Sequence, residues 1–167
     1  LIKTLPADGA SLEAIDASNL DSDSDADFRK MAKKWLAENA PEFELPRGEK
    51  ISDTRHAEVA RGWQKRLHKG RYAGLMLPEE IGGRGASLME ALIFADEEAQ
   101  YNVPRGPFTK IGLNMALPVI LKHGRPDQIE RFVEPTLSGE IAWCQLFSEP
   151  GAGSDLAGLR TKAVKDG

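Results

Sequence analysis

Apolar side chains recur at intervals of three and four residues between residues 28 and 140, which is the spacing of one face of an α-helix. The first such face comprises Phe28, Met31, Ala32, Trp35 and Leu36. Pro41 disfavours helical backbone at the residue before it, so we expect the first helix to end there. A second face, which ends near Gly70, comprises Val59, Ala60, Trp63 and Leu67.

A capping box predicts the start of a third helix. In the segment Ser87–Glu90, the serine and the glutamate side chains can each satisfy a backbone N–H of the other residue. The apolar face behind this box comprises Leu88, Ala91, Leu92, Ala95 and Ala99. On this pattern Glu97 and Glu98 lie at a solvated edge of the helix, although paired acids can also serve acid–base chemistry.

Two more helical segments follow, and together they predict a mainly α fold, a helical bundle. The residues from Ile111 to His123 are largely apolar, and Gly124 stands where a helix commonly ends. A shorter apolar face before Pro135 comprises Ile129, Phe132 and Val133. Three glycines within residues 82–85 indicate a tight loop between the second and third helices.

The periodicity changes after Gly139. Large side chains at positions 141, 143, 145 and 147 alternate with smaller ones, which predicts a β-strand. A single strand has no partner, so this strand would open a strand-rich unit. We therefore divide the chain into an acidic tail or linker (residues 1–27), an α-helical domain (28–140) and the beginning of a β domain (141–167).

Composition and charge narrow the class of protein. Of the 167 residues, 41% are hydrophobic and 29% are charged, which is typical of a globular protein and excludes disorder of the whole chain. Residues 1–27 carry seven acids and one base, so the rest is close to neutral and lacks the basic surface that nucleic acids require. No apolar run reaches the ~20 residues of a membrane span. Because Cys144 is the single cysteine, we expect a reducing, cytoplasmic location.

The segment Ser148–Asp155 is the strongest candidate for a binding loop. Its glycines, Gly151 and Gly153, let backbone N–H groups approach a flat polar ligand or a phosphate closely. A plain turn with nothing bound remains an alternative on residue chemistry alone. The three histidines lack the spacing of metal ligands, so we predict no metal site.

Three separated motifs resemble the acyl-CoA dehydrogenase family, in the family's order. They are Leu77–Gly85 (LPEEIGGRG), 123–128 (HGRPDQ) and 143–163 (WCQLFSEPGAGSDLAGLRTKA). The likeness covers roughly residues 28–167, the helical N-terminal domain and the opening of the middle β domain. Leu146 and Phe147 depart from the family pattern, because they are bulkier than the residues usual before Ser-Glu.

The resemblance implies FAD as cofactor and assigns residues to its site. Those implied to contact FAD are Gln145, Leu146, Phe147, Ser148, Gly153 and Ser154. Ser154 would also meet the CoA part of the substrate, and the helix that carries Ile111, Asn114 and Leu117 would form a wall of the acyl pocket. The family's catalytic base, a glutamate, lies in a C-terminal helical domain, so no catalytic residue is assigned within this sequence.

The activity implied by the resemblance is α,β-dehydrogenation of an acyl-CoA thioester, a step of lipid metabolism such as the β-oxidation of fatty acids. Electrons would pass to an electron-transfer flavoprotein, and members of the family are usually homo-oligomers. Two alternatives stay open at this stage. One is an acyl-CoA oxidase, which keeps the fold and changes the oxidant; the other is a helical domain that serves only for assembly.

Overall fold

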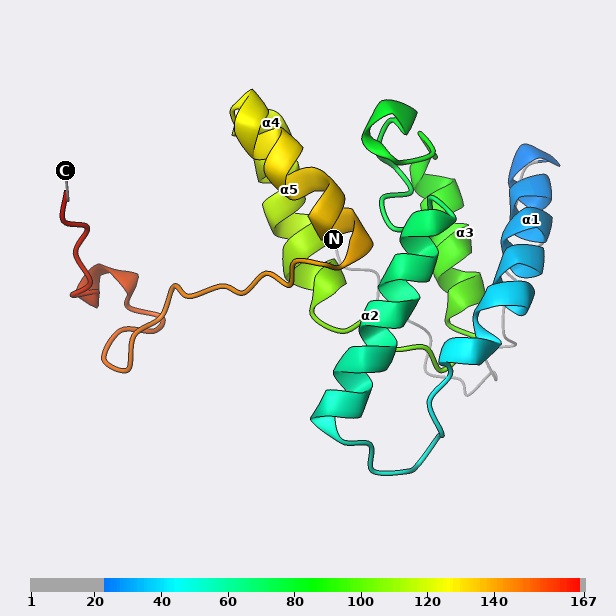
Figure 1. Ribbon diagram of the computed structural model, residues 1–167, viewed down its shortest axis with the longest axis horizontal. Coiled ribbons are helices and arrows are strands. Elements are labelled where there is room, and N and C mark those ends of the chain that lie inside the picture. The colour runs from blue at the N-terminus through cyan, green and yellow to red at the C-terminus, as the bar shows by residue number, and fades with distance from the viewer. Residues whose placement is uncertain (1–22, 166–167) are drawn as a thin grey trace, which may run out of the picture.

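The computed structural model describes residues 23–165 as a bundle of helices followed by an extended segment that runs away from it (Figure 1). The α-helices are α1 (Asp23–Asn39), α2 (Asp53–Lys69), α3 (Leu88–Glu98), α4 (Leu117–His123) and α5 (Pro126–Ser138). Between α3 and α4 lies the π-helix η4 (Phe108–Ala116). Short 3₁₀ turns are η2 (Pro41–Phe43), η3 (Glu79–Ile81) and η5 (Leu156–Gly158). The mainly α class is confirmed.

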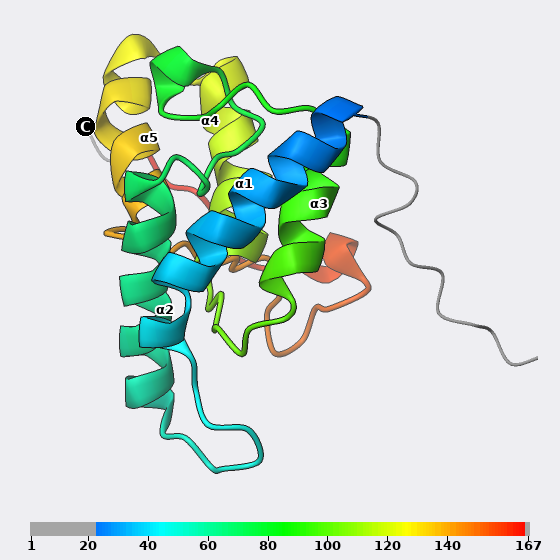
Figure 2. The same cartoon turned by 90° about the vertical axis from the view of Figure 1, so that its right-hand side faces the viewer.

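The bundle is held by helix pairs that pack across one apolar core. α1 crosses α3, while α5 packs against both α2 and α4 (Figure 2). The largest fully buried side chains include Trp63, Leu36, Leu67, Ile93, Leu117 and Leu137. An aromatic cluster joins the loop after α2 to α1 and α3, with the rings of Tyr72 and Phe94 stacked at 4.4 Å.

The capping box at the start of α3 is confirmed in both halves. The Ser87 hydroxyl accepts from the Glu90 N–H at 3.1 Å, and the Glu90 carboxylate accepts from the Ser87 N–H at 2.7 Å. The end of α2 is also confirmed, because Gly70 caps it. None of the helices in residues 23–165 combines the length and the apolarity that a membrane crossing needs.

The predicted apolar face of α3 is wrong. Leu88 and Leu92 are 67% and 56% exposed, whereas the buried residues of the helix are Ile93, Phe94, Glu97 and Glu98. The two glutamates are buried because donors from other elements meet their carboxylates, so burial leaves no unpaired charge. A search for apolar side chains alone does not find a buried helix face that includes paired glutamates.

Two helix boundaries also differ from the prediction. Helix α1 begins at Asp23, within the expected tail. The negative charges of Asp23 and Asp25 in its first turn interact favourably with the positive end of the helix dipole. The rest of the predicted tail, residues 1–22, lies outside the described residues. Helix α5 continues past Pro135 to Ser138, where the Thr136 hydroxyl donates to the Phe132 carbonyl at 2.6 Å.

The strand expected over residues 141–147 is not formed: residues 23–165 contain no β-strand. The segment is extended, but no other part of residues 23–165 pairs with its backbone, and the hydrogen-bond ladder of a sheet needs a second strand. One isolated bridge joins Glu149 to Ala152. The division of the chain at residues 140 and 141 remains a prediction.

Candidate functional site

The extended segment after α5 is anchored by the indole of Trp143. Its Nε1–H donates to the Thr136 hydroxyl at 2.9 Å, and its ring meets Phe132 edge-on at 5.6 Å. The Ile141 N–H also donates to the Pro135 carbonyl at 3.0 Å. Through these contacts the last helix fixes where the segment leaves the bundle.

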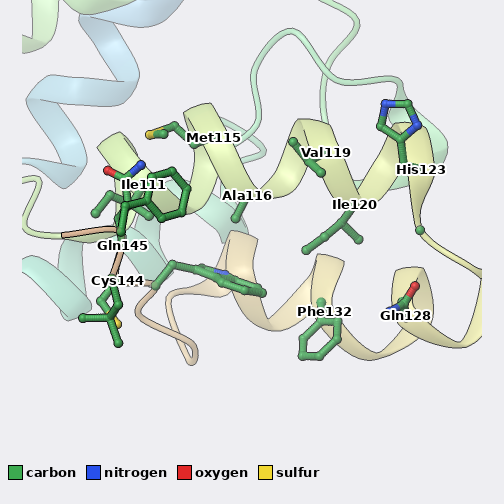
Figure 3. Close-up of a pocket in the computed structure, with 14 residues that line it drawn as sticks. Ile111, Met115, Ala116, Val119, Ile120, His123, Gln128, Phe132, Cys144 and Gln145 are labelled. Atoms are coloured by element: carbon green, nitrogen blue, oxygen red, sulfur yellow. The ribbon is translucent and has the colours of Figure 1, made fainter. Parts of the chain in front are cut away.

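A cavity of about 640 Å³ lies between this segment and the helices (Figure 3). One wall comes from η4 and α4, where the lining side chains are Ile111, Met115, Ala116, Val119, Ile120 and His123. The other walls comprise Gln128 and Phe132 of α5 and residues 143–147 of the segment. The lining is mostly apolar, so the cavity suits an apolar group that lies close to the segment's backbone.

Four of the six residues expected to contact FAD lie on this segment and present a backbone without partners among the described residues: Gln145, Leu146, Phe147 and Ser148. Leu146 and Phe147 are 86% and 64% exposed. Within the part of the chain that the structure describes, no backbone N–H of residues 142–148 has a hydrogen-bond partner. The segment can therefore offer a row of donors and acceptors to a flat polar ligand.

The glycine-rich loop that follows is closed by Glu149, a residue that we did not single out from the sequence. Glu149 and Ala152 exchange two backbone hydrogen bonds of 3.0 Å. The Glu149 carboxylate accepts from the N–H groups of Arg160 at 3.0 Å and Thr161 at 2.7 Å, and from the Thr161 hydroxyl. These hydrogen bonds, led by that of the hydroxyl, lower the pKa of Glu149.

The loop leaves room beside its backbone. A Cβ added at Gly151 or Gly153 would meet nothing within 4 Å among the described residues, so no contact inside the chain requires a glycine there. Free N–H groups on the preceding segment and open space at two glycines fit a cofactor with a polar ring and phosphates. Ser154, expected to contact both FAD and CoA, is exposed on this loop.

A second cavity, of about 520 Å³, lies on another side of η4. Residues 72–77, α3, η4 and α4 line it, and its side chains with polar groups are Tyr72, Arg105, Thr109 and Asn114. Ile111 lines the first cavity, whereas Asn114 and the buried Leu117 line the second. The side chains predicted to form one acyl-pocket wall are therefore divided between two cavities.

Buried carboxylates of α3 bind donors of α1 and α2 and Arg105, which lines the second cavity. Glu98 accepts from the Trp63 indole at 2.8 Å and from Nε of Arg105 at 2.7 Å. Glu97 accepts from Arg29 of α1 at 2.6 Å. The expected solvated edge is thus a set of ion pairs between elements, and two adjacent acids were the only sign of these ion pairs in the sequence.

Among the described residues, no group of three or more His, Cys, Asp or Glu side chains could hold a metal ion.

Comparison with known proteins settles the family. Residues 22–140 match the N-terminal domain of acyl-CoA dehydrogenases. The chain belongs to this family. The matched region contains helices α1 to α5, and the extended segment and the glycine-rich loop follow it.

Curated acyl-CoA dehydrogenases from bacteria and mammals are similar to this chain. FadE34 of Mycobacterium tuberculosis is 61% identical over 83 residues, which are 50% of this chain and 11% of FadE34. IpdE1 of the same organism is 37% identical over 144 residues, 84% of this chain and 37% of IpdE1. The mitochondrial long-chain specific enzyme of Sus scrofa is 36% identical over 110 residues, 66% of this chain and 25% of the enzyme. The chain thus spans 11% to 37% of these relatives' length.

Solved structures of the family share the fold. The ChsE4-ChsE5 complex from Mycobacterium tuberculosis superposes with a TM-score of 0.65 and 31% identity, over 88% of this chain and 36% of that chain. The Tcur3481-Tcur3483 steroid ACAD gives a TM-score of 0.65 and 29% identity, over 88% of this chain and 37% of that chain.

Proposed function

We propose that this chain forms part of the flavin and acyl site of an FAD-dependent acyl-CoA dehydrogenase. The observation that carries the proposal is the extended segment 143–148: its backbone N–H groups have no partner among residues 23–165, and residues 143–147 border an apolar cavity. An apolar wall beside a row of hydrogen-bond donors suits a fatty-acyl group lying against a polar ring. Family membership supports the same reading.

We propose that Gln145, Leu146, Phe147, Ser148, Gly153 and Ser154 hold FAD. When bound, FAD supplies the acceptor of the hydride removed from the acyl group. The fixed N–H groups of the segment would stabilise negative charge that grows on the ring, because preorganised donors need no rearrangement during the reaction. Open space at Gly153 would let phosphate oxygens reach the loop's backbone.

On the substrate side, we propose that Ile111 and Asn114 contact the acyl group and that Ser154 meets CoA. The dehydrogenation also needs a base for the α-proton, and we assign that role to no residue of this chain.

The partners proposed are an electron-transfer flavoprotein and further subunits in an oligomer. Support for the latter is that solved relatives include the ChsE4-ChsE5 complex. We also propose a cytoplasmic location, since the single cysteine suits a reducing compartment.

FAD binding by the complete natural polypeptide tests this proposal. We expect it to retain FAD, and we expect Gly153→Val to weaken FAD binding by about tenfold or more, because the side chain fills the approach to the loop. Unfolding of the FAD-free variant should match that of the wild type, since the space beside Gly153 is open. A complete polypeptide that binds no FAD would sink the proposal.

Two alternative functions have distinct signatures. Hydrogen peroxide released in step with turnover would identify an acyl-CoA oxidase with the same fold. A natural polypeptide that binds neither FAD nor acyl-CoA would favour a helical assembly domain. Because the Tcur3481-Tcur3483 relative is described as a steroid ACAD, we propose steroid-derived acyl-CoA thioesters as one class to test beside straight-chain ones.

A further inference from the structure

The second cavity contains polar side chains that the proposed dehydrogenation does not use. We propose that it binds the part of the acyl group remote from the thioester, and that Arg105 and Thr109 recognise a neutral oxygen there, a ketone or a hydroxyl. This inference rests on the proposed function and names a substrate class for it. It requires a long or bulky acyl group, because η4 separates this cavity from the one beside residues 143–147.

The size and walls of the cavity fit such a group. Its volume of about 520 Å³ falls in the range of small-molecule pockets. The apolar lining includes Leu75, Phe94, Leu113 and Leu117. An acyl group made mainly of hydrocarbon would remove these side chains from water, which favours binding.

Thr109 has a hydroxyl without a partner. Its Oγ1 is buried and makes no hydrogen bond; among the described residues the only other such side-chain atom is Oε1 of Gln64, which lies outside the cavity. Rotation about χ1 exchanges the hydroxyl with the methyl group or the hydrogen, so it can turn the hydroxyl toward the cavity. The rotation gives up no hydrogen bond, and a ligand oxygen would supply one that the folded chain lacks.

Arg105 is held in place and its charge is already matched. Its Nε and Nη2 lie 2.7 Å and 2.5 Å from the Glu98 carboxylate, which is itself fixed by the Trp63 indole. No partner of Nη1 is found among the described residues, so this donor remains available. A carboxylate ligand would sit close to Glu98 and meet its repulsion, whereas a ketone or hydroxyl would accept the hydrogen bond without it.

The test compares two acyl-CoA ligands of equal length, one of which carries a single ketone remote from the thioester. Both have two methyl groups at the α-carbon, so they lack the proton that dehydrogenation removes. Calorimetry on the complete FAD-loaded polypeptide should give at least about tenfold tighter binding of the ketone, because two donors meet its oxygen. Thr109→Val should reduce this preference, because Arg105 still donates, and should keep the affinity for the plain ligand. The matched control is Thr54→Val, an exposed position on α2, which should change neither.

Each outcome decides one claim. Equal preference in wild type and Thr109→Val would overturn the role of Thr109, and a preference unchanged in Arg105→Lys would overturn that of Arg105. Tighter binding of a ligand with a carboxylate in place of the ketone would overturn the neutral-oxygen class. Binding of the plain ligand alone would overturn this inference and leave the proposed function standing. Failure of all ligands to bind would remove the proposed function and this inference together.

Discussion

At the scale of single residues, a buried carboxylate joins three parts of the bundle. Glu98 of α3 accepts from Trp63 of α2 and from Arg105 in the loop before η4. The sequence predicted a solvated edge here, because an acid next to another acid is usually exposed. The donors that reverse this lie outside α3, 35 residues away for Trp63 and seven for Arg105, so the apolar pattern of the helix does not indicate them.

Removing this carboxylate should be costly. Glu98→Ala leaves the indole N–H and the guanidinium of Arg105 without their partner, so we expect the free energy of unfolding to fall by about 3 kcal/mol. Denaturant titration of wild type and variant measures the loss. The control is Glu58→Ala, which removes an exposed ion pair with Arg55 and should cost below about 0.5 kcal/mol. Equal losses in the two variants would contradict the role of Glu98.

Gly83 is required by close backbone contact. A Cβ at this position would overlap the Leu77 carbonyl oxygen and lie 2.6 Å from that of Gly74, and backbone atoms cannot give way as a flexible side chain can. We expect Gly83→Ala to lower stability by about 3 kcal/mol or more. Thermal unfolding checks this against Gly151→Ala, where the added methyl group meets open space. A Gly83→Ala protein as stable as the Gly151→Ala protein would refute the contact.

The Glu149 loop should depend on pH in one direction. Hydrogen bonds from the Thr161 hydroxyl and from the N–H groups of Arg160 and Thr161 lower the pKa of Glu149 from its ordinary value of 4.5. Closure is therefore fully favoured above that value and is lost as the pH falls through the lowered pKa. Amide exchange of Arg160 and Thr161, after correction for intrinsic rates, should speed up in acid. Glu149→Gln should remove this pH dependence, and its persistence would show that another group is responsible.

At the scale of elements, the sequence predicts where helices lie better than which side they bury. The capping box and Gly70 are local signals, so α3 begins and α2 ends where we expected. Which side of α3 is buried depends on ion pairs with other elements, so our prediction of that side was wrong. The π-helix also had no signal, since Phe108–Ala116 reads as ordinary apolar helix.

The cap of α3 provides a test at this scale. Ser87→Ala removes the side-chain acceptor for the Glu90 N–H, so we expect a loss of about 1 kcal/mol in the free energy of unfolding. Ser87→Asp keeps an acceptor at the same place and should stay within a few tenths of the wild type. Chemical denaturation of the three proteins compares these values. An alanine variant as stable as the aspartate variant would mean that the capping box contributes little.

At the scale of the whole molecule, the binding surface arises where the bundle meets the segment that leaves it. The motif at residues 143–163 led to the family from sequence alone, because the order of its glycines and polar residues resembles the family's motif. The cavities could not be predicted, since their walls come from η4, α4, α5 and the loops. The strand predicted over 141–147 finds no partner within residues 23–165 and does not form, and residues 144–147 are exposed.

The proposed activity is tested most directly by an anaerobic titration of the complete, FAD-loaded polypeptide with straight-chain and steroid-derived acyl-CoA thioesters, followed by flavin absorption. An α,β-dehydrogenation passes two electrons to the flavin, so at least one thioester should bleach the oxidised-flavin band without any other reductant. Full flavin occupancy with a spectrum that no thioester changes would contradict the claim that this chain forms part of an acyl-CoA dehydrogenase site.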